Sequence, residues 1–341
     1  MIKYCFKTIL LCSAISAQIE NVQTITKTGT TVAQFLKIGI DARGSAMGGA
    51  VVGQSGNLSS VYWNPAGLVR HSGVGAEFGS HDWLAAMKFQ YAVTGIELKG
   101  KGVLGLWIVN LSSPEDLVRT VAEPEGTGEK FSANDLSAAV TYAKMLTDNF
   151  ALGGSVKYIQ LNIWHTTART VAVDLGALFT TPFKGIRLGA SISNYGGKMK
   201  MDGRDQKIGV DPDPVNQGNV EFINAYYETE YFPIPLFFRV GFSGEIINSD
   251  KLKLMYGLDA LHPNDNSEYV NLGVEATLNN FVSLRAGYPS LFKDDSIEGP
   301  TFGAGLNYRI WRTSTILKID YSIADFGPLG SVERLSVGFN F

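Results

Sequence analysis

The feature that most constrains this chain is the alternation of long and short connections between its predicted strands. Alternating apolar and polar residues, bounded by turn residues, predict about fourteen strands, mostly about nine to fourteen residues long. This length exceeds that of typical soluble strands and suits a tilted strand crossing a bilayer. The predicted strands cover residues 73–80, 84–97, 102–111, 134–146, 150–162, 169–181, 185–194, 234–247, 251–262, 267–278, 281–289, 299–310, 313–325 and 331–341.

Connection length follows strand parity. Every connection after an even-numbered strand is a tight turn, as at 99–101 and 279–280, whereas the long connections at 112–133, 195–233 and 290–298 follow odd-numbered strands. Outer-membrane barrels combine short periplasmic turns with longer outer loops. A secreted β-sandwich or propeller, the alternative for a chain with 38 glycines, has no reason to sort loops this way. We therefore predict an all-β transmembrane antiparallel barrel at 71–341, whose strands begin and end at the short-turn side.

The two faces of the strands support a membrane barrel. In 267–278, Leu272 and Val274 share an apolar face, while Asn271 and Glu275 share the other. An apolar face can contact lipid, and a polar face suits a lumen. A closed barrel leaves no unpaired backbone edge in hydrocarbon. Its last strand ends on the aromatic Phe341, which resembles the C-terminal signature of outer-membrane barrels.

The N-terminus predicts export. Lys3 and Lys7 precede a short apolar stretch at 9–12, and small residues lead to a cleavage site before Gln18. Residues 1–17 therefore resemble a signal peptide, since the apolar stretch is too short to span a membrane. We expect the protein in the outer membrane of a Gram-negative-type cell.

Both cysteines, Cys5 and Cys12, lie in this leader. A lipoprotein signal at Cys12 is the weaker alternative, because Leu11 occupies a position where a small residue is expected. The mature chain is then predicted to lack disulfides and cysteine-bound metals. A formal charge of −3 gives no basic field for nucleic acid.

Residues 18–70 are predicted to form a periplasmic or hatch segment that plugs the barrel. The stretch 33–68 is rich in small residues and lacks sustained alternation, which suits a compact element in a lumen. The predicted plug motif comprises Met47, Gly48, Gly49, Trp63, Asn64, Pro65 and Gly67.

The sequences FLKIG at 35–39, AMGGA at 46–50 and YWNPAGL at 62–68 resemble the start of PorV/PorQ-type proteins, which belong with the FadL-like outer-membrane barrels. The resemblance spans nearly the whole mature chain and implies a fourteen-stranded barrel with an N-terminal hatch. It also implies an accessory role in type IX protein secretion, in which exported cargo or its C-terminal signal is bound. Further similar segments are GGKM at 196–199, DGRD at 202–205, PND at 263–265, GVE at 273–275 and RAGY at 285–288.

No motif points to an enzyme or a cofactor. The sequence lacks a Gly-x-Ser-x-Gly elbow and a phosphate-binding glycine loop. The four histidines are not spaced as a zinc pair; they are His71, His81, His165 and His262. Acidic residues in the loops at 195–233 and 262–268 leave calcium binding open, although solvated loops are the simpler interpretation.

Charged residues of both signs fall on the predicted luminal face. One interpretation is that they brace the plug against the wall, and the other is that they line a polar conduit or gate. An apolar pocket against Phe35, Leu36 or Trp63 also stays open. The predicted luminal network comprises Lys157, Asp174, Arg239, Asp259, Glu275, Arg285, Arg309, Lys318 and Asp320.

Two functions remain in competition. A secretion accessory predicts exposed aromatic loop residues that bind exported cargo or secretion components. FadL-like uptake of a hydrophobic small molecule instead predicts an apolar luminal pocket beside the plug. The sequence analysis favours the accessory on family resemblance. Its predicted contact residues in the outer loop are Tyr226, Tyr227, Tyr231 and Phe232.

Overall fold

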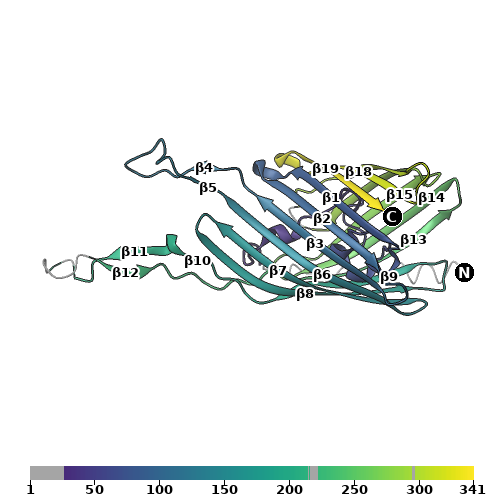
Figure 1. Cartoon of the computed structure of the whole chain (residues 1–341), viewed down its shortest axis with the longest axis horizontal. Helices are drawn as coiled ribbons and strands as arrows, with labels where there is room; N and C mark the ends of the chain where they lie inside the picture. The colour runs from purple at the N-terminus through teal and green to yellow at the C-terminus, as the bar shows by residue number, and fades with distance from the viewer. Residues whose placement is uncertain (1–26, 214, 216–221, 294–295) are drawn as a thin grey trace, which may run out of the picture.

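The computed structural model describes residues 27–213, 215, 222–293 and 296–341, which form a closed antiparallel barrel (Figure 1). The predicted leader and residues 18–26 lie outside the described residues. The main sheet has fifteen strands, and without the two-residue β10 the wall has the predicted fourteen. The wall strands are β1 (Val74–Asp82), β2 (Lys88–Glu97), β3 (Val103–Ser112), β6 (Ala133–Thr147), β7 (Phe150–Ile163), β8 (Thr166–Thr180), β9 (Arg187–Gly196), β13 (Phe237–Asn248), β14 (Leu252–Pro263), β15 (Tyr269–Leu278), β16 (Val282–Leu291), β17 (Thr301–Arg309), β18 (Ile316–Asp325) and β19 (Ser331–Asn340).

The wall is a continuous ring of antiparallel strands. The first strand pairs with the last through Gly75–Asn340, and β8 pairs with β9 through Gly176–Ser191. The one large boundary difference is the strand predicted at 84–97. There the 3₁₀ turn η3 (Leu84–Ala86) precedes β2, because Ala85 and Ala86 have φ near 58° in the left-handed region and interrupt an extended strand.

The predicted division of faces is confirmed. Leu272 and Val274 of β15 are exposed on the outside, whereas Asn271 and Glu275 of the same strand are buried toward the lumen. No described helix is long and apolar enough to span a membrane. Leu272 and Val274 lie on the apolar outer face of the wall, the kind of surface that a membrane barrel presents to lipid.

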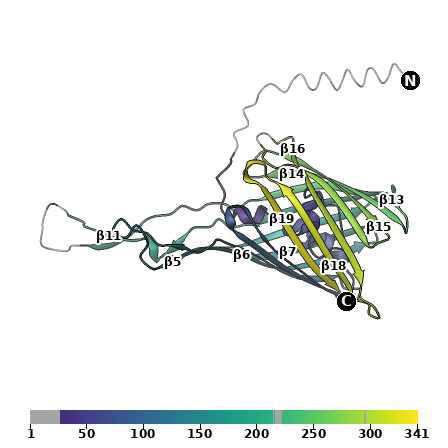
Figure 2. The ribbon, with the colours of Figure 1, turned by 90° about the horizontal axis from the view of Figure 1, so that it is seen from above.

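Two hairpin arms project from the long-loop end of the barrel, well beyond the wall (Figures 1 and 2). The first arm, residues 113–132, pairs β4 (Asp116–Leu117) with β5 (Lys130–Phe131). The second arm, described over residues 204–213 and 222–227, pairs β11 (Lys207–Val210) with β12 (Ile223–Tyr226). The sequence predicts loops at both arms, because strands of two to four residues are too short for a periodic signal. Two smaller elements at this end are η4 (Arg204–Gln206) and η5 (Gly327–Leu329), and β10 (Asp202–Gly203) pairs with β8.

The segment before β1 fills the lumen as a plug. Its elements are η1 (Gln34–Lys37), α2 (Ala42–Ala46), α3 (Ser60–Trp63) and η2 (Pro65–Arg70), drawn in purple in Figure 2. At its start the amide of Val32 bonds to the Pro233 carbonyl (3.0 Å) at the long-loop end. At its far end Arg70 bonds to Thr180 (3.0 Å) beside a short turn. The plug thus runs the length of the lumen. Its described start lies at the long-loop end, whereas the first barrel strand begins at the short-turn side.

Glycines in the wall let the plug backbone lie directly against the strands. A Cβ added at Gly273 would lie 2.3 Å from the Met47 carbonyl oxygen, and one at Gly189 would lie 2.2 Å from that of Val52. Five of these glycines are paired across neighbouring strands, Gly257 with Gly273, Gly273 with Gly287, and Gly153 with Gly176. The high glycine content of the chain is thus partly a requirement of the plug. The wall glycines against the plug backbone are Gly153, Gly176, Gly189, Gly257, Gly273 and Gly287.

The adjacent glycines Gly153 and Gly154 of β7 provide a matched test of this packing. A Cβ at Gly153 would lie 2.5 Å from the Ala66 nitrogen, whereas one at Gly154 meets nothing closer than 3.4 Å. We predict that Gly153→Ala lowers the free energy of unfolding by about 1–3 kcal/mol through overpacking. Gly154→Ala should change it little. The measurement is the temperature of the heat-modifiable gel shift, and equal midpoints for both variants would contradict the account.

The direction of the plug gives a second prediction. A cysteine at exposed Thr28 should react with a membrane-impermeant maleimide on intact cells, because this segment lies at the long-loop end. A cysteine at Asp148, in the short turn between β6 and β7, should react only after the membrane is opened. The predicted absence of other cysteines in the mature chain makes each label unique. Labelling in the reverse order would contradict this orientation.

Candidate functional site

The Asn-Pro-Ala-Gly element anchors the plug to the wall. The Asn64 side-chain amide donates to the Val52 carbonyl (2.8 Å) and to the Ala177 carbonyl of β8 (3.0 Å). Its oxygen accepts from the Ala66 amide (3.1 Å), and Pro65 begins η2 where no amide donor is needed. Asn64 is fully buried, and its polar atoms are satisfied by plug and wall together. Gly67 lies against Ser60 and Gln54, where a side chain would collide.

The Met47-Gly48-Gly49 part of the predicted motif forms a tight turn against β15 and β16. Gly48 and Gly49 have φ of 62° and 76°, a conformation that favours glycine. A Cβ at Gly48 would also lie 2.8 Å from the Tyr288 nitrogen. Met47 is fully buried. Trp63, the remaining motif residue, packs edge-on against Tyr62 with ring centroids 4.9 Å apart.

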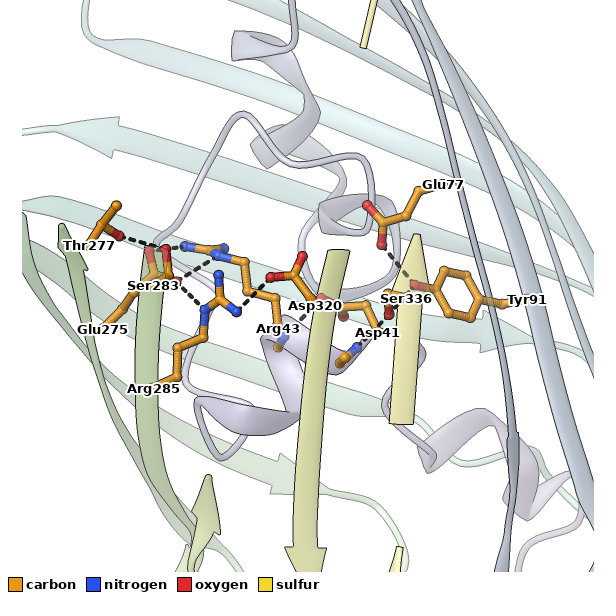
Figure 3. Close-up of polar contacts among 12 residues, drawn as sticks. Asp41, Arg43, Glu77, Tyr91, Glu275, Thr277, Ser283, Arg285, Asp320 and Ser336 are labelled. Carbon is orange, nitrogen blue, oxygen red and sulfur yellow. Dashed lines mark hydrogen bonds and ion pairs between the residues drawn. The ribbon is translucent and has the colours of Figure 1, made fainter. Parts of the chain in front are cut away.

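Part of the predicted luminal network ties the plug to the wall (Figure 3). The Arg43 guanidinium of α2 donates to Glu275 of β15 through Nε (2.9 Å) and Nη2 (3.2 Å). Arg285 donates to the same carboxylate (2.5 Å) and to Asp320 (2.6 Å). These buried charges are paired and hydrogen-bonded, as stability requires. This arrangement matches the bracing interpretation of the network.

A second group of luminal charges lies where β8 and β9 change register. The ammonium of Lys157 lies 2.8 Å from Asp174 and also bonds to the Asn194 side chain. The Asn194 amide donates to Asp174 (2.7 Å). Asp259 of β14 accepts from the plug amide of Val52 (2.8 Å). These contacts fasten the wall at its register shift and fix the plug to β14.

Two predicted network residues stay apart from these groups. Arg309 is exposed at the last position of β17, beside a short turn, and none of the ion pairs among the described residues includes it. Lys318 lines a polar pocket at the short-turn end with Arg43 and Glu77, without an ion pair within 4.0 Å among the described residues. The position of a charged residue on the luminal face of its strand therefore does not show whether that residue contacts the plug.

A cavity of about 520 Å³ lies between the plug and the long-loop end of the barrel; we call it the outer pocket. Plug residues Phe35, Ile38 and Trp63 form one side, so the apolar pocket left open by the sequence is present. Its size falls within the range of small-molecule sites. The other aromatic residues that line it are Trp83, Phe237, Tyr269 and Phe326.

Two arginines in the outer pocket lack an acidic partner among the described residues. Arg239 and Arg334 are each 4% exposed. Arg239 donates to Ser193 (3.2 Å) and lies over the Phe237 ring at 4.8 Å, and its Nε has no hydrogen-bond partner. Arg334 lies 5.2 Å from the Trp83 ring, with Nε and Nη1 unpartnered. Asp135, Glu298 and Asp325 also line the pocket, but none of them forms an ion pair with either arginine within 4.0 Å, so the free guanidinium donors favour an anionic group.

Sequence reasoning missed several residues that build this site. Arg334 lies on the luminal parity of the last strand, between exposed Glu333 and Leu335, so strand alternation could have found it. Asp41 gave no sequence signal, because it lies in an irregular segment, and Asp265 was considered only as an acidic loop residue that could bind calcium. Asp41 caps α2 through the Gly44 amide (2.8 Å) and accepts from the Trp63 indole (2.8 Å).

The predicted contact residues of the outer loop lie on or near the second arm. Tyr226, Tyr227 and Tyr231 are 56%, 65% and 62% exposed, and Phe232 is also exposed. Lys207 and Lys200 lie over the rings of Tyr226 and Tyr231, at 5.8 and 5.5 Å. The arm therefore presents aromatic side chains to solvent.

Asp265 latches the start of the plug to the long-loop end. Its buried carboxylate accepts from Lys37 (2.5 Å) and Gln34 (3.3 Å), and it also bonds to Thr31. Burial alone would raise the pKa of Asp265, but the bonds and charge from Lys37 and the bonds from Thr31 and Gln34 hold that pKa below its ordinary value. The latch therefore stabilises the plug above the unfolded pKa of about 4, and this stabilisation is lost as pH falls through the lowered value.

We predict that Asp265→Asn loosens this segment at neutral pH. A cysteine at buried Ala33 should then react with maleimide about tenfold faster, since a loss of about 1.4 kcal/mol raises the open population tenfold. Glu268→Gln, at an exposed pair with His262 in the same loop, is the control and should leave the rate unchanged. An unchanged rate in Asp265→Asn would exclude the latch.

The network in Figure 3 gives a prediction about stability. Glu275→Gln leaves two buried guanidinium groups without their shared carboxylate and should lower the free energy of unfolding by about 3 kcal/mol. Glu115→Gln removes an exposed partner of Lys130 and should cost less than about 1 kcal/mol. Urea unfolding in detergent micelles compares the two. Similar midpoints would show that the network does not hold the plug.

Comparisons with known proteins follow the architecture. No family model matches the sequence, and no curated protein matches it. A Pseudomonas aeruginosa FadL homologue has a TM-score of 0.53 at 11% identity, over 89% of this chain and 98% of that chain. The Ralstonia pickettii toluene transporter TbuX has 0.54 at 12%, over 88% and 97%. The P. putida toluene transporter TodX has 0.54 at 12%, over 89% and 99%. The chain therefore has the fold of the FadL-like outer-membrane barrels.

Proposed function

We propose that this protein is an outer-membrane channel that binds hydrophobic small molecules with an acidic head group in its outer pocket and passes them across the membrane. The observation that carries the proposal is the pair of buried, unpaired arginines, Arg239 and Arg334, in an aromatic pocket against the plug. The aromatic and aliphatic lining would hold the apolar part of the ligand. The free guanidinium donors would bind its carboxylate.

Two further points support uptake over the role first favoured from the sequence. The pocket adjoins the plug, as uptake requires. Solved structures of similar fold include proteins described as toluene transporters and a monoaromatic hydrocarbon channel. The proposed ligand differs from a neutral hydrocarbon in its charge, because Arg239 and Arg334 face the pocket and form no ion pair within 4.0 Å among the described residues.

The test compares 4-phenylbutyrate with 4-phenylbutanol, which differ in the head group. We expect the acid to bind the purified barrel and quench tryptophan fluorescence, since Trp63 and Trp83 line the pocket. Arg239→Met with Arg334→Met should weaken acid binding by tenfold or more and leave the alcohol unaffected, because hydrogen bonds to charged groups contribute about 1.5–3 kcal/mol. Arg309→Met, at the exposed end of β17, is the matched control. Equal binding of acid and alcohol would refute the acidic-ligand proposal.

A second candidate function is binding of exported protein at the cell surface, as an accessory of type IX secretion. The exposed tyrosines of the second arm support this candidate. Replacing Tyr226, Tyr227 and Tyr231 with serine should then impair secretion while the barrel folds normally. Intact secretion in this variant and in a deletion strain, together with poor growth on the acidic ligand in the deletion strain alone, would favour uptake.

A further inference from the structure

The outer pocket and a second cavity lie on opposite sides of the plug. The second, which we call the inner pocket, has a volume of about 270 Å³ and lies near the short-turn end, lined by Asp41, Arg43 and Lys318 among others. Between the two lies a void of about 10 Å³, lined by Asp41, Arg43, Gly44 and Trp63. Trp63 lines both the outer pocket and this void, and Asp41 lines both the void and the inner pocket.

The Trp63 side chain is held in place by contacts of its own indole ring. Its indole N–H donates to Asp41 (2.8 Å). A Cβ at Gly39 or Gly44 would lie 2.9 or 2.7 Å from indole atoms, so the ring lies directly against the backbone of both glycines. On the side of the outer pocket, the Arg239 guanidinium lies 5.8 Å from the ring. Trp63 is 9% exposed and is the one residue that lines both the void and the outer pocket among the described residues.

The rest of the plug is much harder to move than this side chain. Plug backbone lies against glycines of six wall strands, and Arg43, Val52 and Asn64 each bond to the wall. Displacing the plug would break all of these contacts at once. Turning the indole breaks one hydrogen bond and the packing of one ring.

We infer that Trp63 is the gate between the outer and inner pockets, and that turning its indole joins them while the plug stays seated. This inference rests on the proposed function, since it supplies the route from the ligand pocket toward the short-turn end. A ligand bound at Arg239 lies next to the Trp63 ring. Filling the outer pocket and turning the ring therefore both change the contact between Arg239 and Trp63. The small residues Gly39 and Gly44 are thus part of the gate, as the surface on which the ring rests.

The experiment measures conductance of the purified protein in planar bilayers. Trp63→Ala should raise the conductance at least tenfold over the unsubstituted protein, because it removes the ring that separates the cavities. Trp63→Phe, which keeps an aromatic ring but loses the bond to Asp41, should give an intermediate value. Trp164→Ala, at an exposed tryptophan in the connection from β7 to β8, is the matched control and should conduct as the unsubstituted protein does. The heat-modifiable gel shift selects folded protein for each variant.

A disulfide staple separates ring movement from plug movement. A Cβ at Gly53 of the plug would lie 3.1 Å from Ser243 Oγ of β13 and 2.9 Å from the Ser243 backbone nitrogen. Gly53→Cys with Ser243→Cys therefore brings two sulfurs within bonding reach after a small backbone shift, and the heat-modifiable gel shift selects stapled protein that has folded. Oxidised Trp63→Ala carrying this staple should conduct as the reduced protein does. Closure on oxidation would show that the plug must move, and it would overturn the inference, as would unchanged conductance in both Trp63 variants. Binding of 4-phenylbutyrate is measured separately. Absence of binding would refute the proposed function, whereas the conductances would still show whether Trp63 separates the two pockets.

Discussion

The structure depends on the direct contact between plug backbone and wall glycines. Without side chains at these positions, the turn at Met47–Gly49 and the start of η2 can lie against β7, β8, β15 and β16 at distances that a Cβ would forbid. This contact fills most of the middle of the lumen, and the two larger luminal cavities among the described residues lie toward its two ends. It also fixes the depth of Asp41 and Trp63, and so determines where the two pockets approach each other.

The luminal charges divide according to this geometry. Where plug and wall meet, each charged group of the Arg43–Glu275–Arg285–Asp320 network has a partner, and the network fastens the plug. In the outer pocket, Arg239 and Arg334 have aromatic neighbours but no acidic partner among the described residues. Paired charges contribute to structure, whereas unpaired ones are available to a ligand. The sequence analysis treated these residues as one network, because strand parity does not distinguish the two environments.

Much of the fold could be predicted because its signals are local. Period-two alternation and turn residues locate the fourteen strands to within a few residues, and loop length by parity predicts the barrel. The direction of the plug could not be predicted, since residues 33–68 have no periodicity that reports depth or orientation. The latch at Asp265 joins segments more than 200 residues apart, and no local pattern indicates such a contact. The roles of Asn64 and Trp63 likewise depend on wall atoms brought near them only by the closed barrel.

The central claim is that the outer pocket binds an acidic, hydrophobic ligand against the plug. The most direct test is an experimental structure of the barrel with bound 4-phenylbutyrate. The account predicts carboxylate oxygens within about 3 Å of guanidinium nitrogens of Arg239 and Arg334, with the phenyl ring among Phe35, Trp63 and Trp83. A ligand bound outside this pocket, or one whose carboxylate points away from both arginines, would contradict it.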